Sequence, residues 1–323
     1  MEINRTDARD IDQRSLNVIL TKFGISRDSL HAVGTEAQVY ALESEKLLKV
    51  YSNPEELNKM LVLRDFYAMV DASGASFQIP EILDVKREGE VLGVIEKKLS
   101  GKPLAEEMTS YDEQEQKVAI GAYFDTAQAI GELGLVSPPD RFLLFDSKGE
   151  SSVRAQDWNG YLRKLISKKI EKLERQLGKL VDDFPQKRDQ FMKLFSGNYG
   201  GKISVIHGDF FPGNVLVESP SSVSGVIDFG MFTMFGDRMF DMATSWLFHT
   251  MYSDNDTAAR SKLLPYVLER CPQGTQNMLY RYGLLYALLS CDMWVREEEL
   301  EENGHFLWSR EILNNSDYWE RAN

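Results

Sequence analysis

The spacing of apolar residues changes several times along the first hundred positions. Apolar residues recur at helical spacing over residues 1–30, and then at near-alternating positions over residues 29–51. Alternation is the pattern of half-buried strands, so the second stretch predicts two or three short antiparallel strands. Helical spacing returns over residues 53–72, and two strand patterns follow, joined by the tight turn Glu88-Gly89-Glu90. We therefore expect three strands, a helix and two more strands in one small sheet.

The rest of the chain is predicted to be mostly helical. A loop signature at Ser100-Gly101-Lys102-Pro103 marks the exit from the sheet. Residues 202–230 interrupt the helical patterns with three short apolar runs around turns, which are typical of strands. The expected fold is α+β with two lobes, a β-rich lobe over residues 1–99 and a larger helical lobe over residues 100–323. The helical patterns themselves lie at residues 112–133, 158–194 and 240–323.

Length and charge exclude several classes of protein. A chain of 323 residues is longer than one hydrophobic core usually holds, which agrees with two lobes. With 37 Lys and Arg against 50 Asp and Glu, the net charge is −13, which argues against a nucleic-acid partner. No apolar run is long enough for a membrane helix, and the polar N-terminus does not resemble a secretory signal. We therefore expect a cytoplasmic protein without a membrane partner.

The densest group of chemically useful side chains lies at residues 205–232. The segment VIHGDFFPGNVLVESPSSVSGVIDFGMF places His207, Asp209, Asn214 and Asp228 within 22 residues, on turns beside short strands. Two carboxylates and an amide are hard oxygen ligands, which suit Mg²⁺ when substrate phosphates complete its coordination. A carboxylate beside such a site could orient or deprotonate an attacking hydroxyl. The segment therefore indicates a magnesium site with a carboxylate base beside it.

This segment also resembles a known family. His207-Gly208-Asp209-x-x-Pro212-Gly213-Asn214, followed by Ile227-Asp228-Phe229-Gly230, is similar to the aminoglycoside phosphotransferase and choline kinase group of enzymes. These are small-molecule relatives of the protein kinases, and the resemblance extends over most of the chain. It implies a protein-kinase-like fold and an enzyme that moves the γ-phosphoryl group of ATP, or of GTP, to a hydroxyl of a small molecule. The implied cofactors are the nucleoside triphosphate and Mg²⁺.

The resemblance implies a role for each residue of the motif. Asp209 matches the catalytic aspartate, which orients the substrate hydroxyl and accepts its proton. Asn214 and Asp228 match the residues that hold Mg²⁺. His207 and Asp241 match residues that support the catalytic loop without taking part in the chemistry.

The nucleotide phosphates require a cation, and Lys49 is the candidate. It stands in the middle of the strand pattern Leu47-Leu48-Lys49-Val50-Tyr51, so it faces either solvent or a cleft, and the motif favours the cleft. The family pairs this lysine with an acidic residue of the following helix. Asp65 aligns best with that residue but is one methylene shorter than the usual glutamate, and Glu56 is the alternative.

Three further assignments concern the loops around the nucleotide. Gly34 marks the phosphate-covering loop, which has one glycine where many family members have two. Glu96 and Lys98 are expected to offer backbone groups to the base at the hinge between the lobes. Phe211 takes the place of a histidine that often precedes the proline, and we expect it to be a packing residue.

The acceptor is less clear from the sequence. Residues 292–302 carry six acidic side chains against one arginine, which would attract a cationic acceptor or serve only as a solvated helix face. A second candidate site combines carboxylates with aromatic rings, which can hold an ammonium group, although aromatics at helical spacing also form cores. Its members are Asp237, Trp246, Asp292 and Trp294.

Two alternatives to a small-molecule kinase remain. A catalytically silent nucleotide-binding regulatory protein could keep the same fold, but it would not need Lys49, Asp209, Asn214 and Asp228 together. A kinase acting on a protein is disfavoured because the segment after Asp228 is short. The leading hypothesis is therefore a phosphotransferase with a small hydroxylated acceptor, cationic in one interpretation.

Overall fold

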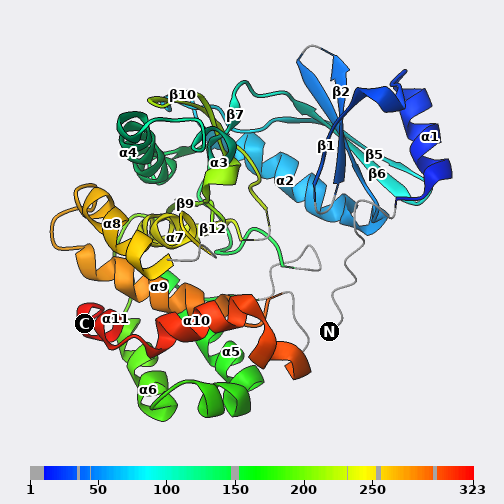
Figure 1. Cartoon of the computed structure of the whole chain (residues 1–323). Helices are drawn as coiled ribbons and strands as arrows, with labels where there is room; N and C mark the ends of the chain where they lie inside the picture. The colour runs from blue at the N-terminus through cyan, green and yellow to red at the C-terminus, as the bar shows by residue number, and fades with distance from the viewer. Residues whose placement is uncertain are drawn as a thin grey trace.

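The computed structural model describes residues 11–34, 37–43, 45–146, 153–230, 232–251, 256–293 and 297–323. A β-rich region holds the N-terminal strands, and a larger helical region holds most of the remaining chain (Figure 1). The predicted α+β fold with a small antiparallel sheet and a larger helical part is confirmed. Among the helices in the described ranges, none is long and apolar enough to span a membrane.

Five antiparallel strands form the main sheet, in the order β1-β2-β3-β6-β5. Helix α2 (Leu57–Met69) lies between the third and fourth of these strands in the sequence, so the predicted order of elements is correct. The strands are β1 (Leu30–Val33), β2 (Ala37–Glu43), β3 (Lys46–Tyr51), β5 (Ile82–Glu88) and β6 (Val91–Lys97).

Different helices cover the two faces of this sheet. Helix α1 (Gln13–Lys22) covers one face, where Ile19 joins a small core with Leu48 and Val50 of β3. Gly93 of β6 allows this approach, because a Cβ there would lie 2.3 Å from Cδ1 of Ile19. Helix α2 covers the opposite face, and its buried residues belong to the main core that continues into the helical region. Because strand side chains alternate, Lys49 points toward the face that α2 covers.

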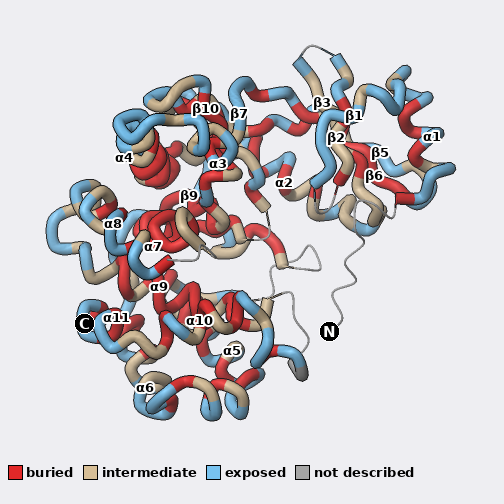
Figure 2. Tube along the Cα trace, viewed as in Figure 1, coloured by how far each residue is buried: buried red, intermediate tan, exposed pale blue. Residues whose placement is uncertain are grey.

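Helices α7 (Met239–Phe248) and α9 (Gln276–Ser290) form the centre of the helical region. All 10 residues of α7 are buried, as the red tube in Figure 2 shows. Helix α4 (Glu113–Ile130) packs beside α7 and begins with a capping box formed by Asp112 and Glu115. The other helices are α3 (Leu104–Glu107), α5 (Trp158–Leu180), α6 (Phe184–Leu194), α8 (Asp256–Leu268), α10 (Gly304–Asn314) and α11 (Ser316–Arg321).

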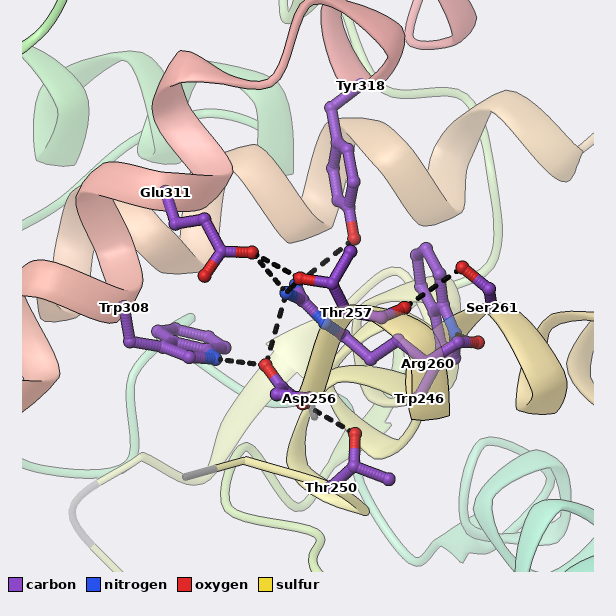
Figure 3. A network of polar contacts seen from close by, with 9 residues as sticks. All are labelled: Trp246, Thr250, Asp256, Thr257, Arg260, Ser261, Trp308, Glu311 and Tyr318. Atoms are coloured by element: carbon purple, nitrogen blue, oxygen red, sulfur yellow. Dashed lines mark hydrogen bonds and ion pairs between the residues drawn. The ribbon is translucent and has the colours of Figure 1, made fainter. Parts of the chain in front are cut away.

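An ion network around the buried Arg260 joins α8 to the two C-terminal helices (Figure 3). The guanidinium of Arg260 lies 3.1 Å from the carboxylate of Asp256 and 2.9 Å from that of Glu311 on α10. It also donates to the hydroxyl of Tyr318 on α11 at 3.3 Å, and Asp256 accepts the indole N–H of Trp308 at 3.0 Å. Buried charges are stable only when they are paired, so this network holds α8 against α10 and α11.

Short strands at the junction of the two regions position two loops. Strand β9 (Ser204–Ile206) pairs with β12 (Met234–Gly236), and β10 (Val215–Ser219) pairs with β11 (Ser222–Val226). The loop after β9 and the loop after β11 are joined directly, since Ile227 donates its amide N–H to the carbonyl of Asn214 at 2.9 Å. The remaining short strands are β4 (Val70–Asp71), β7 (Lys102–Pro103) and β8 (Gly134–Leu135).

Candidate active site

The loop after β9 turns at Gly208. Its φ angle is +81°, in the left-handed region that favours glycine, and a Cβ there would lie 1.9 Å from the carbonyl oxygen of Phe232. Any other residue would therefore have to displace backbone. The turn ends the buried run of β9, and Asp209, which follows it, is half-buried.

The carboxylate of Asp241 holds this turn from the first turn of α7. It accepts the amide N–H of His207 at 2.6 Å and that of Gly208 at 2.9 Å. Burial raises the pKa of Asp241 to about 7, although the two amide hydrogen bonds act in the opposite direction. The structure thus places Asp241 where the family resemblance predicts a support for the loop.

His207 is fully buried beneath the same loop. Its Nδ1 accepts the amide N–H of Asp209 at 3.2 Å, so Nε2 carries the proton and donates to the carbonyl of Ile227 at 2.8 Å. Burial lowers the pKa of His207 to about 4, which keeps the ring neutral near pH 7. A neutral histidine with both nitrogens bonded to backbone is a bridge between the two loops.

Asp209 and Asn214 are linked by a hydrogen bond across the loop. Asn214 is buried and donates its Nδ2–H to the backbone carbonyl of Asp209 at 2.9 Å, which leaves Oδ1 as the acceptor of this amide. Burial raises the pKa of the Asp209 carboxyl to about 6, and the negative charge of Asp228 raises it further in the same direction. Asp209 is therefore a stronger base than an exposed aspartate and is still mostly ionised at pH 7.

Asp228 follows β11 and has an uncommon backbone conformation. Its φ angle is +69°, a left-handed conformation that costs an ordinary residue about 1–3 kcal/mol. The next residue, Phe229, is buried, and its ring lies 4.4 Å from that of His207 and 5.5 Å from that of Phe66 on α2. Packing of Phe229 thus fixes the backbone, while the carboxylate of Asp228 stays exposed.

Lys49 lies across from these loops and is paired with Glu96. Its Nζ is 2.8 Å from Oε2 of Glu96, and the two side chains are 21% and 6% exposed. Burial acts to lower the pKa of Lys49, but the attraction of Glu96, followed by those of Tyr51 and Asp228, leaves it above its usual value. The structure therefore brings Lys49, Asp228 and Asp209 to one place between the two regions.

The expected acidic partner of Lys49 on α2 was wrong. Asp65 is 72% exposed and lies 3.2 Å from the guanidinium of its neighbour Arg64. Glu56, the alternative, pairs with Lys59 at 2.7 Å. The physical reason is the orientation of α2, whose buried side is formed by Met60, Leu63, Phe66 and Tyr67, while Asp65 lies on its exposed side.

The residues expected at the hinge, Glu96 and Lys98, have partners inside the protein. Lys98 does not offer its backbone N–H to a ligand, because this group donates to the carbonyl of Glu45 at 2.8 Å and extends the strand ladder. Glu96 contributes its side chain to Lys49, which was not expected. Gly34 donates its N–H to the carbonyl of Ala37 at 2.9 Å and closes the turn between β1 and β2, whose residues 35 and 36 lie outside the described ranges.

Three of the four residues expected at the acceptor site form contacts within the helical region instead. Asp237 is buried and accepts the hydroxyl of Tyr282 at 2.9 Å, and Trp246 donates to the carbonyl of Arg260 at 2.9 Å. The carboxylate of Asp292 is held by two lysines of α5, and Glu301 from the same acidic stretch also pairs with α5. These residues are therefore structural, which corrects the acceptor prediction. Trp294 lies outside the described residues.

Two residues around the loop have roles that the sequence did not indicate. Tyr123 of α4 is buried, donates its hydroxyl to the carbonyl of Phe210 at 2.8 Å and stacks on the Phe210 ring at 4.8 Å. Phe210 is therefore the packing residue of this loop. Phe211, for which packing was expected, is 38% exposed.

An antiparallel sheet with a half-buried lysine, facing two loops that carry aspartate, asparagine and aspartate, is the arrangement of a kinase-like phosphotransferase. The sequence agrees, because residues 29–269 match the family model described as the phosphotransferase enzyme family APH. The chain belongs to this family, and the resemblance noted from its motifs is confirmed. It is thus an enzyme that carries out nucleotide-dependent phosphotransfer to hydroxyl groups of small molecules. No curated protein matches the sequence significantly.

Solved structures with the same fold cover nearly the whole chain. The gentamicin complex of APH(2")-IIa is 15% identical, with a TM-score of 0.60, and the alignment covers 96% of this chain and 98% of that one. ADP-bound aminoglycoside phosphotransferase APH(2'')-Ib is 17% identical, with a TM-score of 0.58 and coverage of 96% and 99%. The GDP complex of aminoglycoside 2'-phosphotransferase-IIIa is 16% identical, with a TM-score of 0.55 and coverage of 95% and 99%. These similarities show the fold and confirm the prediction of a kinase-like architecture.

Proposed function

We propose that this enzyme transfers the γ-phosphoryl group of ATP, or alternatively of GTP, to a hydroxyl of a small molecule, with Asp209 as the base. The observation that carries the proposal is the convergence of Lys49, Asp209, Asn214 and Asp228 at the junction of the two regions. The charge of Asp228 acts on the pKa values of both Asp209 and Lys49, so Asp228 lies close to both.

Asp209 is suited to receive the proton of the acceptor hydroxyl. Its backbone is fixed by the hydrogen bonds from Asn214 and to His207, and its carboxyl pKa of about 6 lies near neutral pH. A base is most effective when its pKa is close to the working pH, because it is then ionised and still has affinity for the proton. Asp209 would orient the hydroxyl and hold its proton after transfer.

The oxygens of Asn214 and Asp228 fit a magnesium ion. The Asn214 amide already donates its N–H to backbone, so its carbonyl oxygen is the remaining ligand atom, and the Asp228 carboxylate is exposed. Among the described residues, no group of three or more His, Cys, Asp or Glu side chains could hold a metal alone. Few protein ligands are what Mg²⁺ accepts when phosphate oxygens and water complete its shell. When bound, the ion would neutralise charge that develops on the phosphates.

We further propose that residues 1–99 and 100–323 act as two lobes with the nucleotide between them. Lys49 from the first lobe would contact the phosphates, and Asp209, Asn214 and Asp228 from the second would complete the site. The acceptor is proposed to be a hydroxylated amine, since the similar protein APH(2")-IIa is solved as a gentamicin complex. Similar proteins are solved with ADP and with GDP, which supports a nucleotide site without deciding between the bases.

A phosphorylation screen tests this function. ATP and GTP would each be offered with Mg²⁺ and a panel of aminoglycosides, amino alcohols and neutral sugars, and nucleoside diphosphate release would be measured. We expect acceptor-dependent release that disappears in Asp209→Asn, while nucleotide binding by calorimetry remains. Nucleotide binding with no turnover on any hydroxyl compound would instead support the silent regulatory protein.

A further inference from the structure

We propose that Glu96 is the positioning residue of Lys49, so that this lysine is aimed at the nucleotide from within the sheet and without an acid from helix α2. The inference rests on the proposed function, because it assumes that Lys49 contacts phosphate. It goes beyond that function by locating the control of the lysine in strand β6.

The strand register creates the pair. Strands β3 and β6 are antiparallel, with Leu47 opposite Glu96 and Lys49 opposite Val94. Side chains two residues apart on a strand share one face, so Lys49 and Glu96 are diagonal neighbours on the same face of the sheet. Long side chains bridge such a diagonal, and here the ammonium and carboxylate meet at 2.8 Å.

Burial makes each partner depend on the other. The Glu96 side chain is 6% exposed, and an ionised carboxylate removed from water to this extent needs a paired cation. Lys49 gains in return, since the carboxylate keeps its ammonium charged despite burial. An ammonium has three N–H donors, so one bond to Glu96 leaves two for phosphate oxygens. The pair can therefore persist when a nucleotide is bound.

Helix α2 supplies no carboxylate on the side that faces Lys49. That side is apolar or aromatic, and it includes the buried Tyr67, whose pKa is raised by burial and then by the charges of Glu96 and Asp228. Tyr67 is thus a neutral group beside the ion pair. Asp65 of α2 and Glu56, which directly precedes this helix, have their own basic partners on α2. In the described part of the chain, the ion pair formed by Lys49 is the one with Glu96.

The consequence concerns what holds Lys49 in place. A lysine that is held by a helix loses its partner when the helix moves, whereas β3 and β6 are joined by backbone hydrogen bonds along their length. Lys49 therefore keeps its direction as long as the sheet is folded. The position of Lys49 is thus controlled from the sheet and not from α2.

Glu96→Gln tests the proposal, with Asp65→Asn as the α2 alternative and Asp84→Asn as a sheet-surface control. We expect Glu96→Gln to lower kcat about 10²-fold, since misplacement of a catalytic group by about 1 Å has that effect. KM for the nucleotide should change much less, because the charges of Asp228 and of the bound phosphates still favour the ammonium form of Lys49. Asp65→Asn and Asp84→Asn should retain wild-type kcat. An equal kcat for Glu96→Gln and wild type, or a loss in Asp65→Asn of the same size, would overturn the proposal.

Stability is separated from positioning by a double variant. Lys49→Gln combined with Glu96→Gln removes both charges of the pair, so we expect it to recover the melting temperature lost in Glu96→Gln but not the turnover. Glu96→Asp, which restores the charge on a shorter chain, should recover part of kcat. A kcat loss in Glu96→Gln that follows the folded fraction alone would make Glu96 merely structural. The proposed function fails if the wild-type enzyme neither binds nor turns over a nucleotide. The role of Glu96 alone fails if the wild-type enzyme is active and Glu96→Gln has the same kcat.

Discussion

The carboxylate of Asp241 accepts the amide N–H of Gly208 at 2.9 Å, and this contact ties helix α7 to the loop that carries Asp209. The second oxygen of the same carboxylate accepts the amide of His207. The loop is thus anchored to a helix whose residues are all buried. Asp209 therefore owes its position to a residue that is remote in sequence.

Asp241→Asn should weaken this anchor. An asparagine has one acceptor oxygen, so its NH₂ group would face one of the two amides, and an unsatisfied buried donor costs about 1–3 kcal/mol. We expect a lower free energy of unfolding in urea and a lower kcat on the folded enzyme. Asp237→Asn, at another buried aspartate that bonds Tyr282, should lose stability but keep kcat. Equal kcat losses in the two variants would contradict the role of Asp241.

The pH dependence of turnover should report Asp209. Its pKa of about 6 belongs to a base that is inactive when protonated, so kcat/KM should rise with pH through about 6 and then level off. His207 should not contribute near neutral pH, because its pKa of about 4 leaves it uncharged. The measurement is kcat/KM for the acceptor from pH 4.5 to 8.5 at saturating nucleotide. An acid limb near the pKa of an exposed aspartate would show that burial does not act on this group.

Much of the fold could be predicted from the sequence, because the apolar spacings of strands and helices differ. The loops at the junction could also be predicted, because their motif is specific. The partner of Lys49 could not be predicted, because it depends on the register of β3 against β6. This register places Glu96 diagonally opposite Lys49. The prediction of the acceptor residues failed for another reason. A carboxylate or an indole in a sequence does not reveal its partner, and Asp292 finds its partners 120 or more residues away on α5.

Gly208→Ala should disrupt the loop. Its left-handed φ and the 1.9 Å approach of a Cβ to the Phe232 carbonyl force a shift of backbone, so we expect destabilisation of at least about 2 kcal/mol and loss of turnover. Gly230→Ala is a matched control in the following loop, where a Cβ would meet no atom within 4 Å. Thermal unfolding and kcat of both variants decide the matter. A Gly208→Ala enzyme with wild-type melting temperature would refute the steric argument.

Substitutions of Asp228 should affect stability and turnover differently. Glycine adopts φ of +69° without strain, so Asp228→Gly should be about 1 kcal/mol more stable than Asp228→Ala, while both lose magnesium-dependent turnover. The same pair of variants at Asp183, whose φ is +51° before α6, should show the stability difference with full activity. Chemical unfolding and a magnesium titration of turnover are the measurements. Retained magnesium-dependent turnover in either Asp228 variant would contradict the assignment of Asp228 as a magnesium ligand.

Arg260→Met should destabilise the C-terminal helices. It leaves the buried carboxylate of Asp256 without its cation, and breaking a buried pair in this way costs about 3–5 kcal/mol. Arg64→Met breaks the exposed pair with Asp65, which should cost less than about 1 kcal/mol. Both variants should keep kcat at a temperature where they are folded. Similar melting temperatures for the two would mean that the Arg260 network contributes little.

Because separate cores lie on the two faces of the main sheet, one face can lose its covering helix while the other stays packed. Detachment of α1 would expose Leu48 and Val50 but leave the opposite face, with Lys49 and Glu96, covered by α2 and the main core. Amides of α1 should therefore exchange with solvent through a local opening, well before those of β3 and β6. The face of the sheet that carries Lys49 and Glu96 is thus shielded from local opening of α1, so α1 can detach while the Lys49–Glu96 ion pair stays intact.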